Sequence, residues 1–214
     1  MVCSRSVFGA TIQLFTTILG KFGIETTYVD MADLAAWQSA VKPNTKMFYL
    51  ETPSNPLTEV GDIAAISKIA KSAGALCVVD NCFCTPALQK PIALGADVVI
   101  HSATKYLDGQ GRVLGGAIVG TEDFILGKVF PYVRTAGPTL SAFNAWVILK
   151  GLETLQLRME KQSQTALDLA AWLEKQPSVE RVFHPGLPSH PQHKVAMAQQ
   201  SMGGPRSEEH TSEL

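Results

Sequence analysis

Short apolar runs alternate with helix-length segments along the first 120 residues. The runs carry β-branched and aromatic residues and are bounded by turn formers, a pattern typical of strands. They predict strands over 25–29, 46–50, 75–80, 97–101 and 116–119. The segments 33–41 and 62–72 predict helices, because each begins with an aspartate suited to the N-cap, Asp33 and Asp62. This alternation predicts βαβ units and therefore an α/β fold, a mostly parallel sheet with flanking helices.

The later part of the chain changes from this alternation to a helical pattern. The strand at 76–79 shows no apolar-polar alternation, which indicates a parallel strand covered on both faces. From about residue 141 to 175 a helical period prevails, broken only near Gly151. We therefore divide the chain into a large sheet domain over 1–140, a long linker helix region over 141–175, and the start of a C-terminal domain over 176–205.

Both ends of the chain depart from this organisation. Residues 206–214 are polar, lack any period and resemble the translation of a sequencing-adapter oligonucleotide, so we expect a non-native tail. At the other end, residues 2–3 open directly into a strand and turn. We expect a chain truncated at both ends.

Composition and charge narrow the class of protein. With 46% hydrophobic and 17% charged residues the chain can bury a core, which excludes intrinsic disorder. A formal net charge of −1 offers no basic field, so no nucleic-acid partner is expected. No apolar stretch approaches the ~20 residues that span a bilayer, so no membrane partner is expected either. Among the four cysteines, Cys77 lies in the apolar run 75–79, which is typical of a reduced, buried thiol and predicts a cytoplasmic protein.

The candidate functional residues lie at the ends of two predicted strands that are consecutive in the sequence. Asp80 closes one strand, Ser102 follows the next, and Thr104 and Lys105 come directly after. Taken singly, Asp80 suits a helix cap and Lys105 a solvated loop. Together they supply what pyridoxal 5'-phosphate (PLP) requires: a lysine amine, a carboxylate for the pyridine nitrogen, and hydroxyls near the phosphate. The combination predicts a PLP site.

Four segments resemble one known family. The stretch 97–111, DVVIHSATKYLDGQG, resembles the lysine signature of the cystathionine γ-synthase-like PLP enzymes of cysteine and methionine metabolism. Other matches, in order and spacing, are 51–56 (ETPSNP), 79–81 (VDN) with 85–88 (TPAL), and 150–155 (KGLETL) with Arg158 and Met159. The resemblance extends from residue 1 to about 204. It implies an incomplete fold type I PLP-dependent transferase, like aspartate aminotransferase, in which 1–140 is part of the PLP-binding large domain. It also implies a homo-oligomer, a dimer-built tetramer, when complete.

Within the group, four segments are most similar to the members that combine O-succinylhomoserine with sulfide. These are 4–9 (SRSVFG), 80–86 (DNCFCTP), 109–112 (GQGR) and 134–139 (RTAGPT). The resemblance implies an enzyme that carries out a γ-replacement, which yields homocysteine and succinate and belongs to methionine biosynthesis. The amino-acid ester and sulfide would be its small-molecule partners.

The resemblance also implies roles for individual residues. Lys105 and Asp80 would be the catalytic and cofactor-binding pair, with Ser102 and Thr104 at the phosphate. Phe8 stands where most members have a tyrosine that stacks on the cofactor ring, so it keeps the aromatic face and loses the hydroxyl.

Two further residues carry alternative interpretations. Asn55 lies by resemblance beside the cofactor's phenolic oxygen or the substrate carboxylate, while as a turn residue it suits its segment anyway. Arg112 is a cation that either pairs with the succinyl carboxylate or with a structural acid.

Other functions stay open. The resemblance also covers cystathionine γ-synthase, cystathionine γ-lyase and O-acetylhomoserine sulfhydrylase activity, and a truncated chain that only binds cofactor. A nicotinamide-dependent oxidoreductase is disfavoured, since Leu114 stands where the third glycine of its fingerprint belongs. No metal site is expected, because His184, His190 and His193 lie in a proline-broken segment without a nearby carboxylate.

Overall fold

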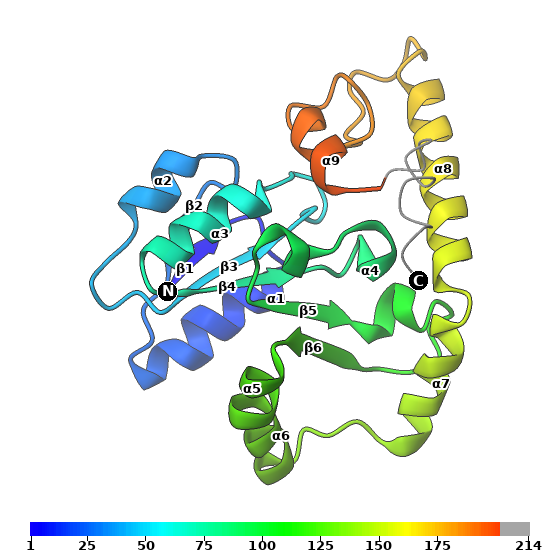
Figure 1. Cartoon of the computed structure of the whole chain (residues 1–214). Coiled ribbons are helices and arrows are strands. Elements are labelled where there is room, and N and C mark those ends of the chain that lie inside the picture. Colours follow the sequence, from blue (N-terminus) through cyan, green and yellow to red (C-terminus); the bar gives the residue numbers. More distant parts are fainter. Residues whose placement is uncertain (202–214) are drawn as a thin grey trace.

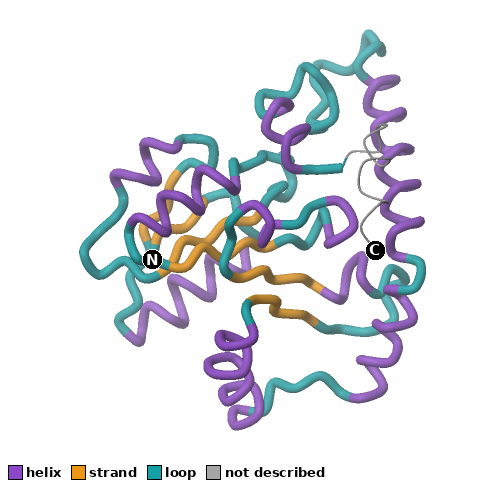
Figure 2. The backbone as a smooth tube through the Cα atoms, in the orientation of Figure 1, coloured by secondary structure: helices purple, strands orange, loops and turns teal. Residues whose placement is uncertain are grey.

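The computed structural model describes residues 1–201, which are built around one six-stranded sheet with helices on both faces (Figures 1 and 2). The strands are β1 (Val2–Ser4), β2 (Thr27–Val29), β3 (Met47–Glu51), β4 (Leu76–Asp80), β5 (Val98–Ser102) and β6 (Gly116–Gly120). Their spatial order is β2-β1-β3-β4-β5-β6. All neighbours pair in parallel except β6, which runs antiparallel to β5 at the sheet edge. The mostly parallel α/β sheet and each predicted strand are confirmed, whereas the predicted tail at 206–214 lies outside the described residues.

Helices and helical turns connect the strands. The α-helices are α1 (Gly9–Gln13), α2 (Leu34–Ser39), α3 (Ile63–Ser72), α4 (Thr85–Leu88), α5 (Glu122–Phe124), α6 (Phe130–Ala136), α7 (Ala142–Leu152), α8 (Leu155–Leu173) and α9 (His193–Gln199). The 3₁₀-helical turns, which are wound more tightly than an α-helix, are η2 (Leu19–Phe22) and η3 (Pro91–Leu94). The π-helical turns, which are wider, are η1 (Leu14–Ile18), η4 (Ala103–Leu107) and η5 (Ile125–Val129).

The predicted helix starts are confirmed by their caps. The side chains of Asp33 and Asp62 accept hydrogen bonds from the backbone N–H groups of Ala36 and Ala65, which satisfies donors that have no partner inside the helix. The predicted helical region 141–175 is confirmed as α7 and α8, with its break next to Gly151. No helix within residues 1–201 has both the length and the apolar character needed to cross a bilayer.

Each face of the sheet packs against its own helices. On one face α2 and α3 cover a core in which Trp37 stacks on Phe48, with ring centroids 5.7 Å apart. On the other face η1 contributes Phe15, whose ring meets Tyr49 edge-on at 5.1 Å. Because side chains alternate along a strand, Glu51 shares the second face with Tyr49.

Candidate functional site

Three of the predicted residues lie at one edge of the sheet. β4 ends at Asp80 and β5 ends at Ser102, and the two strands pair in parallel with Asp80 opposite Ile100. Lys105 follows in η4, where its side chain is exposed. The carboxyl ends of parallel strands lie at the same edge of a sheet, and ligands of α/β proteins bind at that edge. Asp80, Ser102 and Lys105 thus end or follow two neighbouring strands at the same end of the sheet.

Asp80 is held in place by two hydrogen bonds. Its Oδ1 accepts from the backbone N–H of Cys82 at 3.1 Å, and its Oδ2 accepts from the Tyr49 hydroxyl at 3.3 Å. Burial raises the pKa of Asp80 above its ordinary value, and these two hydrogen bonds partly offset the rise. A cation beside this carboxylate would favour its ionised form, so Asp80 is suited to hold a protonated ring nitrogen.

Glu51 is a second carboxyl group at the same edge, and its sequence pattern indicated no role for it. It lies opposite Asp80 in the β3–β4 register and is only 3% exposed. Its Oε2 accepts a 2.7 Å hydrogen bond from the backbone N–H of Phe8. Burial raises the pKa of Glu51 to about 7, the Phe8 hydrogen bond lowers it and the charge of Asp80 raises it further. Glu51 thus links the segment that carries Phe8 to the strand end beside Asp80.

Phe8 is available as an aromatic platform. It directly precedes α1, and its ring is 57% exposed although its backbone is tied to Glu51. An aromatic face of this kind can stack on a planar ligand. Stacking of Phe8 on the cofactor ring stays a prediction.

The two hydroxyl residues differ in how they are engaged. Ser102 is half-buried at the end of β5. Thr104 accepts from the backbone N–H of Gly115 at 3.0 Å, and its hydroxyl donates to the Gly115 carbonyl at 3.2 Å. Thr104 therefore fastens η4 to the segment that leads into β6.

Arg112 pairs with a structural acid. Its Nε donates to Asp108 Oδ1 at 2.8 Å, its backbone N–H donates to Oδ2 at 2.6 Å, and the Asp108 side chain is fully buried. Burial raises the pKa of Asp108, but the hydrogen bonds and charge of Arg112 outweigh it and hold the pKa below its ordinary value. Arg112 Nη2 also donates to the carbonyl of Val147 in α7 at 3.4 Å. Of the two interpretations of Arg112, this geometry favours the structural one.

α7 packs closely against η4, the turn that carries Lys105 and is called the lysine turn below. A Cβ added at Gly151 would stand 2.3 Å from the carbonyl oxygen of Leu107 and 2.6 Å from that of Asp108. Only a glycine lets the helix approach the backbone of this turn so closely. The position of η4 therefore depends on α7.

Replacing Gly151 with alanine is expected to destabilise the chain by about 1–3 kcal/mol, because the new methyl group meets backbone atoms that cannot move away cheaply. Gly127→Ala in η5 is the matched control, since nothing lies within 4 Å of its added Cβ and alanine favours helix by up to about 1 kcal/mol. Urea unfolding of both variants measures the difference. Equal stability of the two variants would contradict the close approach of α7.

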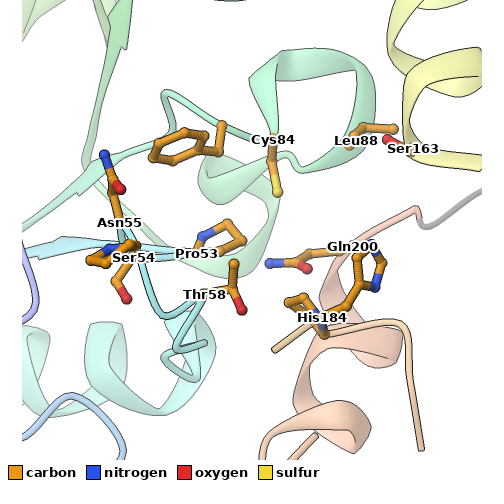
Figure 3. A pocket seen from close by; sticks show the side chains of 12 residues that line it. Pro53, Ser54, Asn55, Thr58, Cys84, Leu88, Ser163, His184 and Gln200 are labelled. Carbon is orange, nitrogen blue, oxygen red and sulfur yellow. The ribbon is translucent and has the colours of Figure 1, made fainter. Parts of the chain in front are cut away.

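Asn55 is one of the residues that border a cavity. The cavity of about 200 Å³ is bordered by the loop that carries Asn55, by Cys84, by α8, and by His184 and Gln200 (Figure 3). Gln200 is 6% exposed and its Oε1 has no hydrogen-bond partner within the described residues. Neither Asp80 nor Lys105 lines this cavity, which lies between the loop after β3, α4, α8 and residues 184–200.

The groups at the strand ends fit PLP in their chemistry. Asp80 offers a buried carboxylate, Lys105 an exposed amine, Phe8 an exposed ring and Ser102 a hydroxyl at a strand end. These are the four kinds of group that the cofactor needs for its ring nitrogen, aldehyde, ring face and phosphate. Thr104 is tied to Gly115, so it supports η4 whether or not it also meets the phosphate.

Comparisons with known proteins agree with this fit. A family model described as "Cys/Met metabolism PLP-dependent enzyme" matches residues 1–205. The chain is 61% identical over 201 residues to an O-succinylhomoserine sulfhydrylase of Pseudomonas aeruginosa, covering 94% of this chain and 50% of the relative. It is 42% identical to a cystathionine gamma-lyase of Bacillus subtilis, covering 93% of this chain and 52% of the relative.

Solved structures give the same result. The crystal structure of metB from Corynebacterium glutamicum superposes with a TM-score of 0.91 at 37% identity, covering 94% of this chain and 52% of that chain. The cystathionine gamma-lyase from Lactobacillus plantarum complexed with L-serine gives a TM-score of 0.90, also at 37% identity, with 94% and 53% covered. The chain spans about half the length of the relatives that it matches.

Proposed function

Because the chain belongs to the Cys/Met metabolism PLP-dependent enzyme family, we propose that it serves the γ-replacement in which O-succinylhomoserine and sulfide give homocysteine and succinate. Its cofactor is PLP, and its fold is that of the fold type I PLP enzymes. The family includes synthases, lyases and sulfhydrylases, so the choice of reaction is our proposal. The observation that carries it is the 61% identity to an O-succinylhomoserine sulfhydrylase, against 42–45% identity to a probable synthase and four lyases among the relatives.

The residues at the strand ends would each contact a different part of PLP. Asp80 would hold the ring nitrogen protonated through a charge-assisted hydrogen bond, and Phe8 would stack on the ring. Ser102 and Thr104 would lie at the phosphate, and Asn55 at the phenolic oxygen or the substrate carboxylate. PLP, when bound, supplies an electron sink for the carbon atoms next to the amino group.

Lys105 would do the proton chemistry. Its amine would bind the cofactor aldehyde covalently until the substrate amine takes its place. The freed amine would then remove a proton from Cα and move protons at Cβ, so that the bond from Cγ to the succinyl oxygen breaks and succinate leaves. Sulfide would form the new bond at Cγ, and the protons would return to Cβ and Cα in reverse order.

The proposed partners and place in the cell rest on other features. The proposed homo-oligomer, a dimer-built tetramer, follows from the family resemblance, and the exposed apolar face of α7, with Phe143, Trp146 and Leu149 56–67% exposed, offers surface for such contacts. All four cysteines are free thiols, and three of them are buried, which supports the reducing cytoplasm.

Steady-state assays of the full-length protein test the proposed reaction. O-succinylhomoserine and O-acetylhomoserine are each offered with sulfide and with cysteine, and the product is identified. The proposal expects the highest kcat/KM with O-succinylhomoserine and sulfide. Faster turnover with cysteine would instead assign cystathionine synthesis, and faster turnover with the acetyl ester would assign the other sulfhydrylase reaction.

The same assays test the substrate role considered for Arg112. We expect Arg112→Ala to lower kcat/KM for the succinyl and acetyl esters by a similar factor, because the variant leaves the buried carboxylate of Asp108 without its cation. A loss of about 10-fold to 100-fold confined to the succinyl ester would place the succinyl carboxylate at Arg112, since a charge-assisted bond contributes roughly 1.5–3 kcal/mol.

A further inference from the structure

One side chain of the long helix α8 reaches the backbone of the lysine turn. α8 packs against η4 (Figure 1). From α8, Arg158 Nη1 donates to the carbonyl of Tyr106, the residue after Lys105, at 2.9 Å. Arg158 belongs to one of the segments that resemble the family, but the sequence alone indicates no role for it.

The same guanidinium is anchored at the junction of α7 and α8. Its Nη2 donates to the carbonyl of Gly151 at 2.8 Å, and its Nε donates to Thr154 Oγ1 at 3.1 Å. A planar guanidinium presents its donors in a fixed arrangement, so three acceptors of this kind hold it in one orientation. Arg158 therefore connects the end of α7, the start of α8 and the carbonyl next to Lys105 through one rigid group.

The turn leaves room for this group at Gly109. A Cβ added there would stand 2.3 Å from Arg158 Nη1, and the glycine has φ of +75°, a conformation that other residues rarely adopt. The backbone N–H of Gly109 donates to the carbonyl of Lys105 itself at 2.8 Å. The carbonyls of Lys105 and Tyr106 are thus both held from the side of Gly109 and Arg158.

Lys105 needs such support, because its backbone is not helical. With φ of −89° and ψ of −119° it departs from the helical turn on either side of it. A residue in a sparsely populated conformation persists only when its surroundings fix it. The hydrogen bonds to the carbonyls of Lys105 and Tyr106 are contacts of this kind.

We propose that Arg158 is a positioning residue that fixes the backbone of Lys105, and so aims its amine at the carboxyl end of the sheet. The inference rests on the proposed function only in taking Lys105 as the cofactor lysine. Its consequence is that the long helix after the sheet acts on the lysine through Arg158, so a shift of α8 relative to the sheet would move the reactive amine.

Amide hydrogen exchange on the chain without cofactor tests whether Arg158 fixes the backbone of the lysine turn. Arg158→Met removes all donors and keeps an unbranched side chain, while Arg158→Lys keeps the charge without the planar arrangement. Lys161→Met is the matched control, because it removes a cation from the exposed side of the same helix. The amides of Asp108 and Gly109 report on the turn, and the amide of Val79 in β4 reports on global unfolding.

We expect exchange at Asp108 and Gly109 to rise by about tenfold or more in Arg158→Met, because this variant loses all the charged donors. The rise should be smaller in Arg158→Lys, which keeps a charged donor. Val79 should be unaffected, and Lys161→Met should leave all three amides unchanged. Unchanged exchange at the turn would overturn the proposal. An equal rise at Val79 would also overturn it, since Arg158 would then stabilise the whole fold rather than position the turn.

A second measurement separates this inference from the proposed function. Added PLP is trapped with borohydride at increasing times, and the rate of labelling at Lys105 is compared between the unchanged chain and Arg158→Met. We expect labelling about tenfold slower in the variant. Equal rates would overturn the positioning role, whereas labelling of another lysine in the unchanged chain would overturn the assignment of Lys105 and leave the exchange result standing.

Discussion

Lys105→Ala is expected to lower turnover of the full-length protein by at least the 10²–10⁴-fold that a positioned acid–base group contributes. The reason is that no other amine follows a strand end at this edge of the sheet within the described residues, so nothing replaces Lys105 in moving protons at Cα and Cβ. Stability should change little, because the side chain is exposed.

The matched control is Lys68→Ala, which removes an exposed lysine from α3, the helix that packs on the sheet face of Trp37 and Phe48. Turnover and unfolding midpoints are measured for both variants. The control should keep its turnover. If Lys105→Ala retains more than about a tenth of the turnover, the assigned role of Lys105 is wrong.

Asp80→Asn is expected to have the second-largest effect, because it keeps the shape of the side chain and removes its charge. Without a carboxylate the ring nitrogen is no longer held protonated, and the electron sink weakens. Loss of the charge-assisted bond alone corresponds to about 10-fold to 100-fold in kcat/KM, from roughly 1.5–3 kcal/mol.

The stability of the Asp80→Asn variant should not fall with its turnover. Because burial raises the pKa of Asp80, the ionised carboxylate is less favourable in the folded chain than in the unfolded chain. Asp80 therefore reduces stability as the pH rises from the ordinary carboxyl pKa through the raised one. At neutral pH, and without cofactor, Asp80→Asn should unfold no earlier than the unchanged chain.

Asp97→Asn is the matched control for both measurements. Asp97 also accepts a hydrogen bond from a backbone N–H, that of Cys77 at 2.8 Å, but it lies next to the amino end of β5. The control should keep the visible absorbance of bound PLP, while Asp80→Asn should change it. Equal losses of turnover and stability in Asp80→Asn would count against its role at the ring nitrogen.

Much of the sheet could be predicted from the sequence because each strand carries its own signal. The unalternating run at 76–79 indicated a covered parallel strand, and the caps Asp33 and Asp62 marked their helices. The stretch 9–22 gave no such signal. It is rich in β-branched residues such as Thr11, Thr16 and Thr17, which lower helix propensity, and it forms helical turns because Phe15 packs against the sheet.

The core of the site could also be predicted, because Asp80, Ser102 and Lys105 end or follow neighbouring strands. The contact between Glu51 and Phe8 could not, since it depends on β1 and β3 being neighbours although β2 lies between them in the chain. The partner of Arg112 was left open for a similar reason. Asp108 lies four residues before it, and only the fold shows that this carboxylate is buried.

The most direct test of the central claim is the site of cofactor attachment. PLP is added to the chain, the complex is reduced with borohydride and digested, and the labelled peptide is identified by mass spectrometry. The account predicts a pyridoxyl group on Lys105, within the segment SATKY at residues 102–106. A pyridoxyl group on any other lysine, with Lys105 unmodified, would contradict it.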